Sequence, residues 1–189
     1  SGSDKEYIAV MKLGESTDTQ DAYGEVLEKA DRIDVSEADI QAVLSLFKGK
    51  ISQLPPMFSA LKHKGKPLYE YARKGIDIAR TSREVNIKSI ELLSFNLPFV
   101  KLKVACSKGT YIRTLCHDIG QKLGVGAHMT ELQRTAIGEF NLKDALEIDE
   151  LKDIDFGRSD NKGVYDMDSA LRWMPELKID TLTAENVKH

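Results

Sequence analysis

Cysteine is scarce in this sequence of 189 residues, which contains only Cys106 and Cys116 and no CxxC pair. No stretch has the composition of a secretory leader, and no apolar run approaches the roughly 20 residues of a membrane-spanning helix. These absences predict a protein of the reducing cytoplasm that does not enter a membrane. We expect both thiols to be buried as small apolar groups, with a disulfide between them as the alternative.

Motifs for metals and nucleotides are also missing. The four histidines lack metal-ligand spacing, and neither HxxxH nor HExxH occurs. Asp18 and Asp21 lie in a polar loop that fails the EF-hand pattern, because Tyr23 stands where that pattern needs glycine. No Walker, GxSxG or dinucleotide-binding motif is present. The sequence therefore predicts no metal site.

The net charge of −3 argues against a general nucleic-acid coat, but charge is distributed unevenly along the chain. Residues 62–83 contain seven Lys or Arg and two acids, and residues 101–135 contain six and two. From residue 144 onward, twelve acids outnumber six basic residues. Two interpretations stay open: a basic face with an acidic tail, or scattered solvated charge.

Hydropathy patterning predicts an α+β fold. Apolar alternation indicates strands at residues 6–13, 85–92 and 100–106. Capping and glycine signals indicate helices at residues 36–49, 68–74 and 109–124, with short helices at 149–154 and 168–173. Strands and helices do not alternate regularly, so we expect a mixed, mostly antiparallel sheet flanked by helices.

A loop and helix at residues 57–75 combine cations with aromatic rings. The loop carries Lys62, His63 and Lys64, and Tyr69 and Tyr71 follow it. This combination suits phosphate contact together with base stacking. The alternative is an exposed loop followed by a half-buried helix.

The segment KGTYIRTLCHDIG, residues 108–120, places Tyr111 and Arg113 at the start of a predicted helix. The helix macrodipole disfavours a cation there, so Arg113 suggests a nearby anionic partner. Tyr111 needs a partner for its hydroxyl if the ring is buried. On this reasoning alone, the corner is either ordinary scaffold or part of a pocket.

Several stretches together resemble the TruB-type tRNA pseudouridine synthases. The matching stretches are SDKEY at 3–7, LGESTDTQDAYG at 13–24, LPPMFSALK at 54–62, LYEYARKG at 68–75, CSKGTYIR at 106–113 and GAH at 126–128, followed by Leu132 and Arg134. They stand in order across nearly the whole chain, and their combination is specific although each alone is weak.

The resemblance implies an enzyme that isomerises uridine to pseudouridine in the T-arm of tRNA, with no metal or organic cofactor. The target nucleotide would be flipped out of its loop into a pocket. Tyr7 would stack on the flipped base and take part in proton transfer. Arg113 would pair with the catalytic aspartate, which accounts for a cation at an unfavourable helix start.

The resemblance also implies the residues that hold the RNA. Tyr111 and Leu132 would line the base pocket, with Lys108 beside it. Residues 54–83 would form an insertion that grips the RNA arm, and its basic loop carries Lys62, His63 and Lys64. No protein partner is required by this interpretation.

One family feature is missing: the catalytic aspartate lies in a Gly-x-Leu-Asp-Pro-type motif, and this sequence contains no Asp-Pro dipeptide. We therefore expect residues 1–180 to be a truncated catalytic domain and residues 181–189 to begin a linker to a missing C-terminal PUA-like RNA-binding domain. Such a chain should be inactive alone, and an exposed sheet edge would invite dimerisation. The alternatives are a non-catalytic RNA-binding module and a protein-interaction domain with an acidic partner.

Overall fold

The computed structural model describes residues 3–154 together with residues 165, 169, 171 and 174. The chain divides into two compact units, residues 1–142 and 143–189. All the strands of the described residues belong to the first unit. In the second, the described residues include the 3-10 helix η2 (Glu150–Asp153), which follows η1 (Leu142–Asp144).

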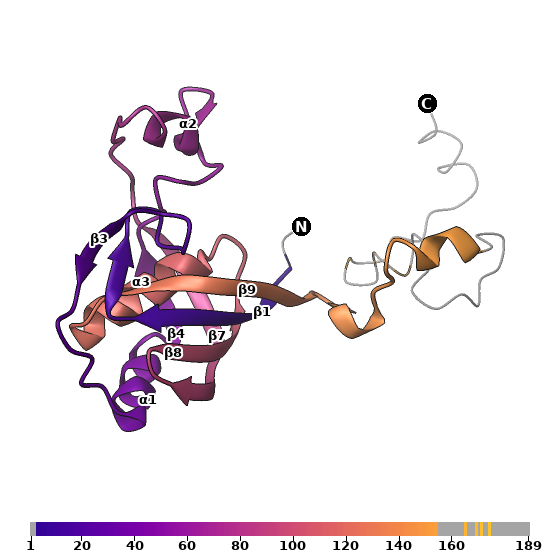
Figure 1. Cartoon of the computed structure of the whole chain (residues 1–189). Coiled ribbons are helices and arrows are strands. Elements are labelled where there is room, and N and C mark those ends of the chain that lie inside the picture. The colour runs from indigo at the N-terminus through magenta and orange to yellow at the C-terminus, as the bar shows by residue number, and fades with distance from the viewer. Residues whose placement is uncertain (1–2, 155–164, 166–168, 170, 172–173, 175–189) are drawn as a thin grey trace. The chain divides into compact units, whose positions relative to one another are not determined.

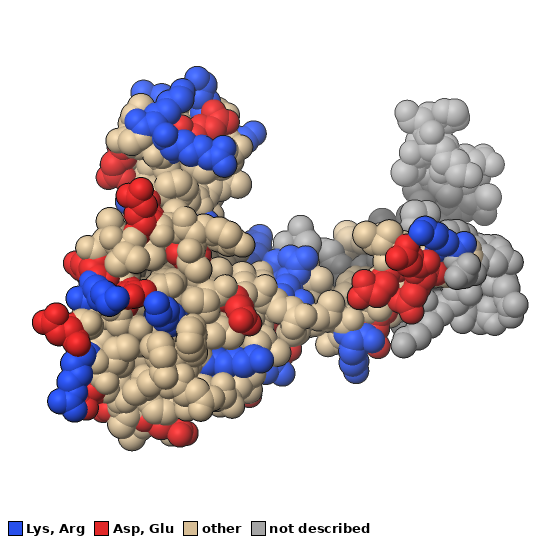
Figure 2. Space-filling view, in the orientation of Figure 1, with Lys and Arg blue, Asp and Glu red and all other residues tan. Residues whose placement is uncertain are grey.

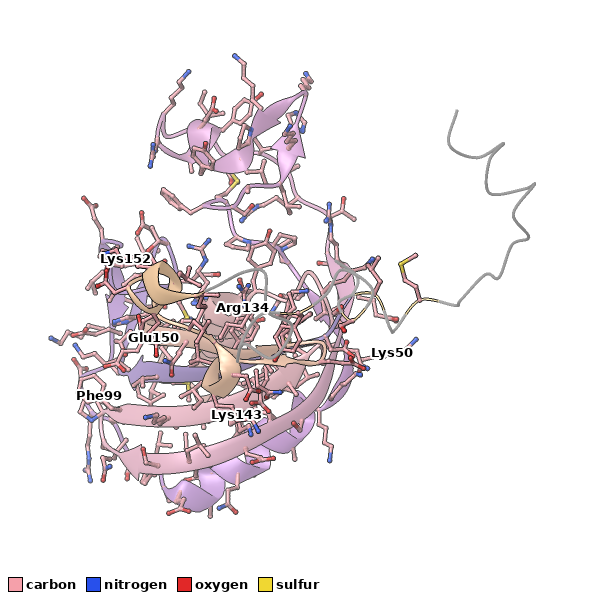
Figure 3. The ribbon with its side chains drawn as sticks, turned by 90° about the vertical axis from the view of Figure 1, so that its right-hand side faces the viewer. Lys50, Phe99, Arg134, Lys143, Glu150 and Lys152 are labelled. Atoms are coloured by element: carbon pink, nitrogen blue, oxygen red, sulfur yellow. The ribbon has the colours of Figure 1, made fainter. Side chains whose placement is uncertain are left out.

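Six antiparallel strands form the main sheet, in the order β10-β9-β1-β8-β7-β4 (Figure 1). Their bounds are β1 Lys5–Leu13, β4 Gly49–Gln53, β7 Arg83–Asn96, β8 Phe99–Cys106, β9 Ala127–Ile137 and β10 Phe140–Asn141. Lys50 and Phe99 mark opposite ends of this sheet (Figure 3). The predicted α+β class with a mostly antiparallel sheet is confirmed.

Two helices, α1 (Glu37–Leu46) and α3 (Ile112–Leu123), supply one side of the core. Alternate residues of β1 and β8 point toward them, among them Met11 and Leu102, and pack with Ile40 of α1 and Ile119 of α3. Both cysteines are buried in this core and free, as predicted. Burial raises the pKa of the Cys116 thiol to about 12, so this thiol is unreactive.

Local signals in the sequence explain the ends of both helices. Ser36 caps α1 in a capping box: its hydroxyl accepts from the Asp39 N–H at 3.2 Å, and the Asp39 carboxylate accepts from the Ser36 N–H at 2.9 Å. Gly124 ends α3 with φ of 76°, a left-handed conformation that favours glycine. Both boundaries were predicted correctly at these residues.

The structure adds strands that patterning missed. The most extensive is β9, and short β4 completes the other edge of the sheet. The loop after Gly14 contains a small hairpin of β2 (Glu15–Thr17) and β3 (Val26–Lys29). The short helix expected at 149–154 is the 3-10 helix η2, while the one expected at 168–173 lies outside the continuously described residues. No helix in the described part of the chain is long and apolar enough to span a membrane.

Candidate active site

The helix start at Tyr111 is fixed from a distant strand. Tyr111 occupies the N-cap position of α3, but no side chain of its own segment caps the helix. Instead, the buried amide of Gln53, at the end of β4, accepts from the Tyr111 N–H at 2.8 Å and donates to the Tyr111 carbonyl at 3.1 Å. This pair of hydrogen bonds, called the Gln53 clasp below, ties the root of the insertion to the helix start.

Arg113 is the second residue of α3, and its side chain links this helix to two other segments. Its Nη1 donates to Asp21 Oδ2 at 3.0 Å, and its Nη2 donates to the Phe58 carbonyl. The Arg113 and Asp21 side chains are 22% and 17% exposed, so the ion pair is largely shielded from water. An anionic partner for this cation was predicted, and Asp21 meets that requirement within the chain.

Several hydrogen bonds hold the loop that carries Asp21 in place. Asp21 Oδ1 accepts from the Thr19 hydroxyl at 2.7 Å and from the Tyr23 N–H at 3.1 Å. The neighbouring Gln20 accepts a hydrogen bond from Thr114 of α3 at 2.6 Å and another, through its carbonyl, from Met129 of β9 at 3.0 Å. The carboxylate is therefore positioned by α3 and β9 together, which limits the positions open to Arg113.

Tyr7 and Leu132 lie on the sheet rather than on the helix. Tyr7 of β1 is opposite Arg134 of β9, and Ala9 is opposite Leu132, so all four side chains share one face. Arg134 is labelled in Figure 3. Partial burial raises the pKa of the Tyr7 hydroxyl, while the nearby Arg134 acts to lower it. Leu132 is 46% exposed, so its side chain is accessible to a ligand.

The remaining predicted residues occupy two different places. Lys108 is exposed in the turn between β8 and α3, next to Gly109, whose φ is 83°. Lys62, His63 and Lys64 belong to the insertion, which Figure 1 shows standing away from the sheet around α2. The structure thus brings Tyr111 and Arg113 together at one helix start, and keeps the three basic-loop residues in a separate module.

The insertion contains a tiny hairpin, β5 (Lys62–His63) with β6 (Lys66–Pro67), followed by α2 (Leu68–Ala72). Figure 2 shows Lys and Arg side chains gathered over it. Its aromatic rings are used internally: His63 meets Tyr71 edge to face at 5.9 Å, and Arg73 lies 5.3 Å from the Tyr69 ring centre. The surface it offers to a partner is therefore mainly cationic.

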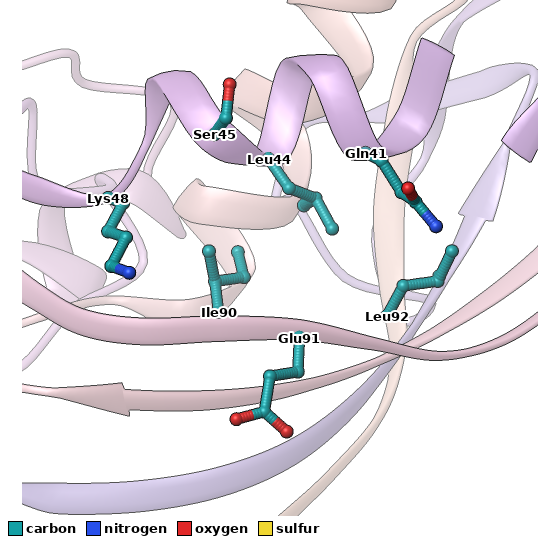
Figure 4. Close-up of a pocket in the computed structure, with 7 residues that line it drawn as sticks. All are labelled: Gln41, Leu44, Ser45, Lys48, Ile90, Glu91 and Leu92. Atoms are coloured by element: carbon teal, nitrogen blue, oxygen red, sulfur yellow. The ribbon is translucent and has the colours of Figure 1, made fainter. Parts of the chain in front are cut away.

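A cavity away from these residues lies between α1 and β7 (Figure 4). It measures about 500 Å³. Its lining residues are Gln41, Leu44, Ser45, Lys48, Ile90, Glu91 and Leu92. None of these is a predicted site residue, and the cavity is on the opposite side of the sheet unit from the insertion (Figure 1).

Sequence reasoning missed Asp21 and Gln53 as site residues. Asp21 is 92 positions from Arg113, and Gln53 is 58 positions from Tyr111. Asp21 had the local pattern of a turn residue, and no local pattern marked Gln53. The family resemblance includes the loop motif at residues 13–24, and this was the only signal in the sequence that pointed to the surroundings of Asp21.

Comparison with known proteins identifies related chains. Residues 1–112 match the model of the TruB family pseudouridylate synthase N-terminal domain, and residues 113–172 match the tRNA pseudouridylate synthase B C-terminal domain. The tRNA pseudouridine synthase B of Clostridium tetani is 50% identical over 149 residues, covering 79% of this chain and 52% of that protein. That of Burkholderia lata is 44% identical over 187 residues, covering 99% and 58%.

A solved structure agrees with these matches. The crystal structure of a Cbf5-Nop10-Gar1 complex contains a chain that is 35% identical, with a TM-score of 0.54. The similarity covers 75% of this chain and 32% of that one. The chain spans about half the length of the curated relatives it matches.

Proposed function

Because this chain belongs to the TruB family of pseudouridylate synthases, we propose that it forms part of the catalytic domain that isomerises uridine to pseudouridine in the T-arm of tRNA. The reaction breaks the bond between uracil N1 and the ribose, turns the base and rejoins it through C5. The target nucleotide leaves its loop and enters the site, as for other enzymes that act on a base. No metal and no organic cofactor takes part.

The observation that carries the proposal is the arrangement around Arg113. A cation held at a helix start by Asp21 and the Phe58 carbonyl is oriented before any substrate arrives. In this position it can pair with the family's catalytic aspartate while Asp21 keeps its guanidinium plane fixed. Arg113 thus acts as the electrostatic centre of the site.

The other residues contact the flipped nucleotide and the RNA arm. Tyr7 stacks on the base and takes part in proton transfer, and its half-buried ring on the shared sheet face supports this role. Leu132 and Tyr111 line the pocket, and Lys108 lies at its rim. Lys62, His63 and Lys64 bind the phosphates of the arm without reading its sequence.

We propose that the chain alone does not convert uridine, because it has no Asp-Pro dipeptide to supply the family's catalytic aspartate. Residues 1–180 then represent part of a catalytic domain. The sheet edge formed by β4, which pairs only with β7 among the described strands, offers a surface for dimerisation. Sedimentation at high concentration tests this last point, and a strictly monomeric profile contradicts it.

The test of function is fluorescence anisotropy of the purified chain with a T-arm hairpin and with a hairpin whose loop sequence is scrambled. We expect tighter binding to the native loop, with affinity that falls steeply as salt rises. Equal weak binding to both hairpins would contradict recognition of the T-arm. Conversion of uridine by the pure chain would overturn the expected inactivity, and binding without conversion when an aspartate-bearing segment is restored would favour a non-catalytic RNA-binding module.

A further inference from the structure

A small cavity of about 130 Å³ lies in the insertion and is lined mainly by basic and apolar side chains. Its basic members are Lys62 and His63 from the β5 hairpin and Arg80 and Arg83 from the segment that returns to the sheet. No acidic residue lines it. Four basic side chains around one small cavity predict an anionic ligand.

The charges around this cavity are only weakly neutralised. Arg80 donates to the Pro55 carbonyl at 3.2 Å and makes a longer contact of 3.4 Å with Asp77, whose side chain is 77% exposed. Because the Asp77 carboxylate is exposed and the contact is long, it neutralises the less exposed Arg80 only weakly. Within residues 3–154, no carboxylate lies within ion-pair distance of Lys62 or Arg83.

The cavity extends from the basic hairpin to the first residue of β7. Arg83 is the first residue of β7 and pairs with Gln53 across the sheet. The side chain of Gln53 in turn forms the clasp on Tyr111. The cavity is therefore at the root of the insertion, where Arg83 pairs with the residue that holds the start of α3.

We propose that this cavity binds one backbone phosphate of the RNA, which makes Arg80 and Arg83 RNA-binding residues in addition to Lys62. The inference rests on the proposed function and adds a defined phosphate subsite to it. A cavity of about 130 Å³ is several times larger than the roughly 10–15 Å³ that one water molecule needs, so it has room for one tetrahedral oxyanion. Arginine is suited to this ligand because its planar donors match phosphate oxygens.

The experiment measures binding of the full chain to the native and scrambled T-arm hairpins across a series of salt concentrations. The variants are Arg83→Gln and Arg80→Gln, and the matched control is Lys48→Gln. Lys48 is exposed, like Arg83, and its substitution removes the same charge, but Lys48 follows α1, which Figure 1 shows on the far side of the sheet unit. Circular dichroism establishes that each variant is folded. Arg83→Gln keeps the test decisive if Arg80→Gln disturbs the insertion through Pro55.

We expect each pocket variant to weaken binding to both hairpins by the same factor. Each should reduce the slope of log affinity against log salt by up to about one, the value for one phosphate contact, because both arginines bind the same phosphate. Lys48→Gln should leave affinity and slope unchanged. An unchanged slope for Arg83→Gln would overturn the phosphate subsite, and so would an equal loss of affinity in Lys48→Gln. A pocket variant that loses only its preference for the native loop would also overturn it. Failure of the proposed function is a separate result: it appears as a wild-type chain with no preference between loops.

Discussion

Substituting Gln53 by leucine removes the Gln53 clasp while nearly preserving side-chain volume. Gln53 is only 2% exposed, and its amide makes both hydrogen bonds to the backbone of Tyr111. Leucine can occupy this space but can neither donate nor accept. The substitution therefore isolates the polar connection between the root of the insertion and the start of α3.

The two lost hydrogen bonds are not equivalent. The Tyr111 carbonyl still accepts from the Leu115 N–H at 3.0 Å, so it loses only a second bond, a net loss of about 0.5–1.5 kcal/mol. The Tyr111 N–H loses its acceptor, which costs about 1–3 kcal/mol when the group is shielded from water. Burying leucine in place of an amide offsets part of this. We expect a net destabilisation of about 2–3 kcal/mol.

Urea unfolding of wild type, Gln53→Leu and the neighbouring control Ser52→Ala measures this change. Ser52 is exposed on the same strand, so its substitution should alter stability by less than about 0.5 kcal/mol. Hydrogen exchange adds a local measurement, because the Tyr111 amide should lose protection before the core strands do. A loss below about 1 kcal/mol together with unchanged protection of the Tyr111 amide would refute the clasp as the device that fixes this helix start.

Three further predictions concern the site, a helix cap and a partly buried acid. Arg113→Leu should lower the free energy of unfolding in urea by about 1–3 kcal/mol, because Asp21 keeps a shielded charge without its cation. Arg113→Lys should recover only part of this loss, since one ammonium group cannot match both Asp21 and the Phe58 carbonyl. Equal stability of wild type and both variants would contradict this. Ser36→Ala should cost about 1 kcal/mol by removing the cap of α1, and no change in the urea midpoint would count against the capping box. Desolvation raises the pKa of Asp118 from 3.8 to about 6, so the folded state binds its proton more tightly and loses stability as pH rises through these values. Asp118→Asn should flatten this part of the stability–pH curve, and an identical curve would show that the carboxyl group is not responsible.

Elements with strong local signals could be predicted from the sequence. The alternation in β1 and β8, the capping box at Ser36 and the glycine at position 124 each fix a conformation within a few residues. The strand β9 has no such signal, because most of its central residues are exposed and polar. Its conformation comes from pairing with β1, a partner more than a hundred positions earlier.

The candidate site shows the same division. An anionic partner for Arg113 was predicted because the helix dipole is a local property of residues 111–123. The identity of that partner depends on how a loop near residue 20 folds against α3 and β9, which no local pattern records. The Gln53 clasp could not be predicted either, since nothing in the sequence around a glutamine at a strand end indicates a contact with a distant helix start.

The pairing of β1 also has a consequence for biosynthesis. This strand lies between β8 and β9, whose sequences come much later, so its first partner cannot pair before residue 99 has been made. Its second partner is complete roughly 120 residues after β1 ends, which at about 5–20 residues per second corresponds to roughly 6–24 seconds of translation. Until residue 99 has been made, β1 has both backbone edges unpaired, and one edge stays unpaired until β9 is complete. Because these pairings are distant in sequence, folding of the sheet should be slow relative to that of helical proteins of equal length.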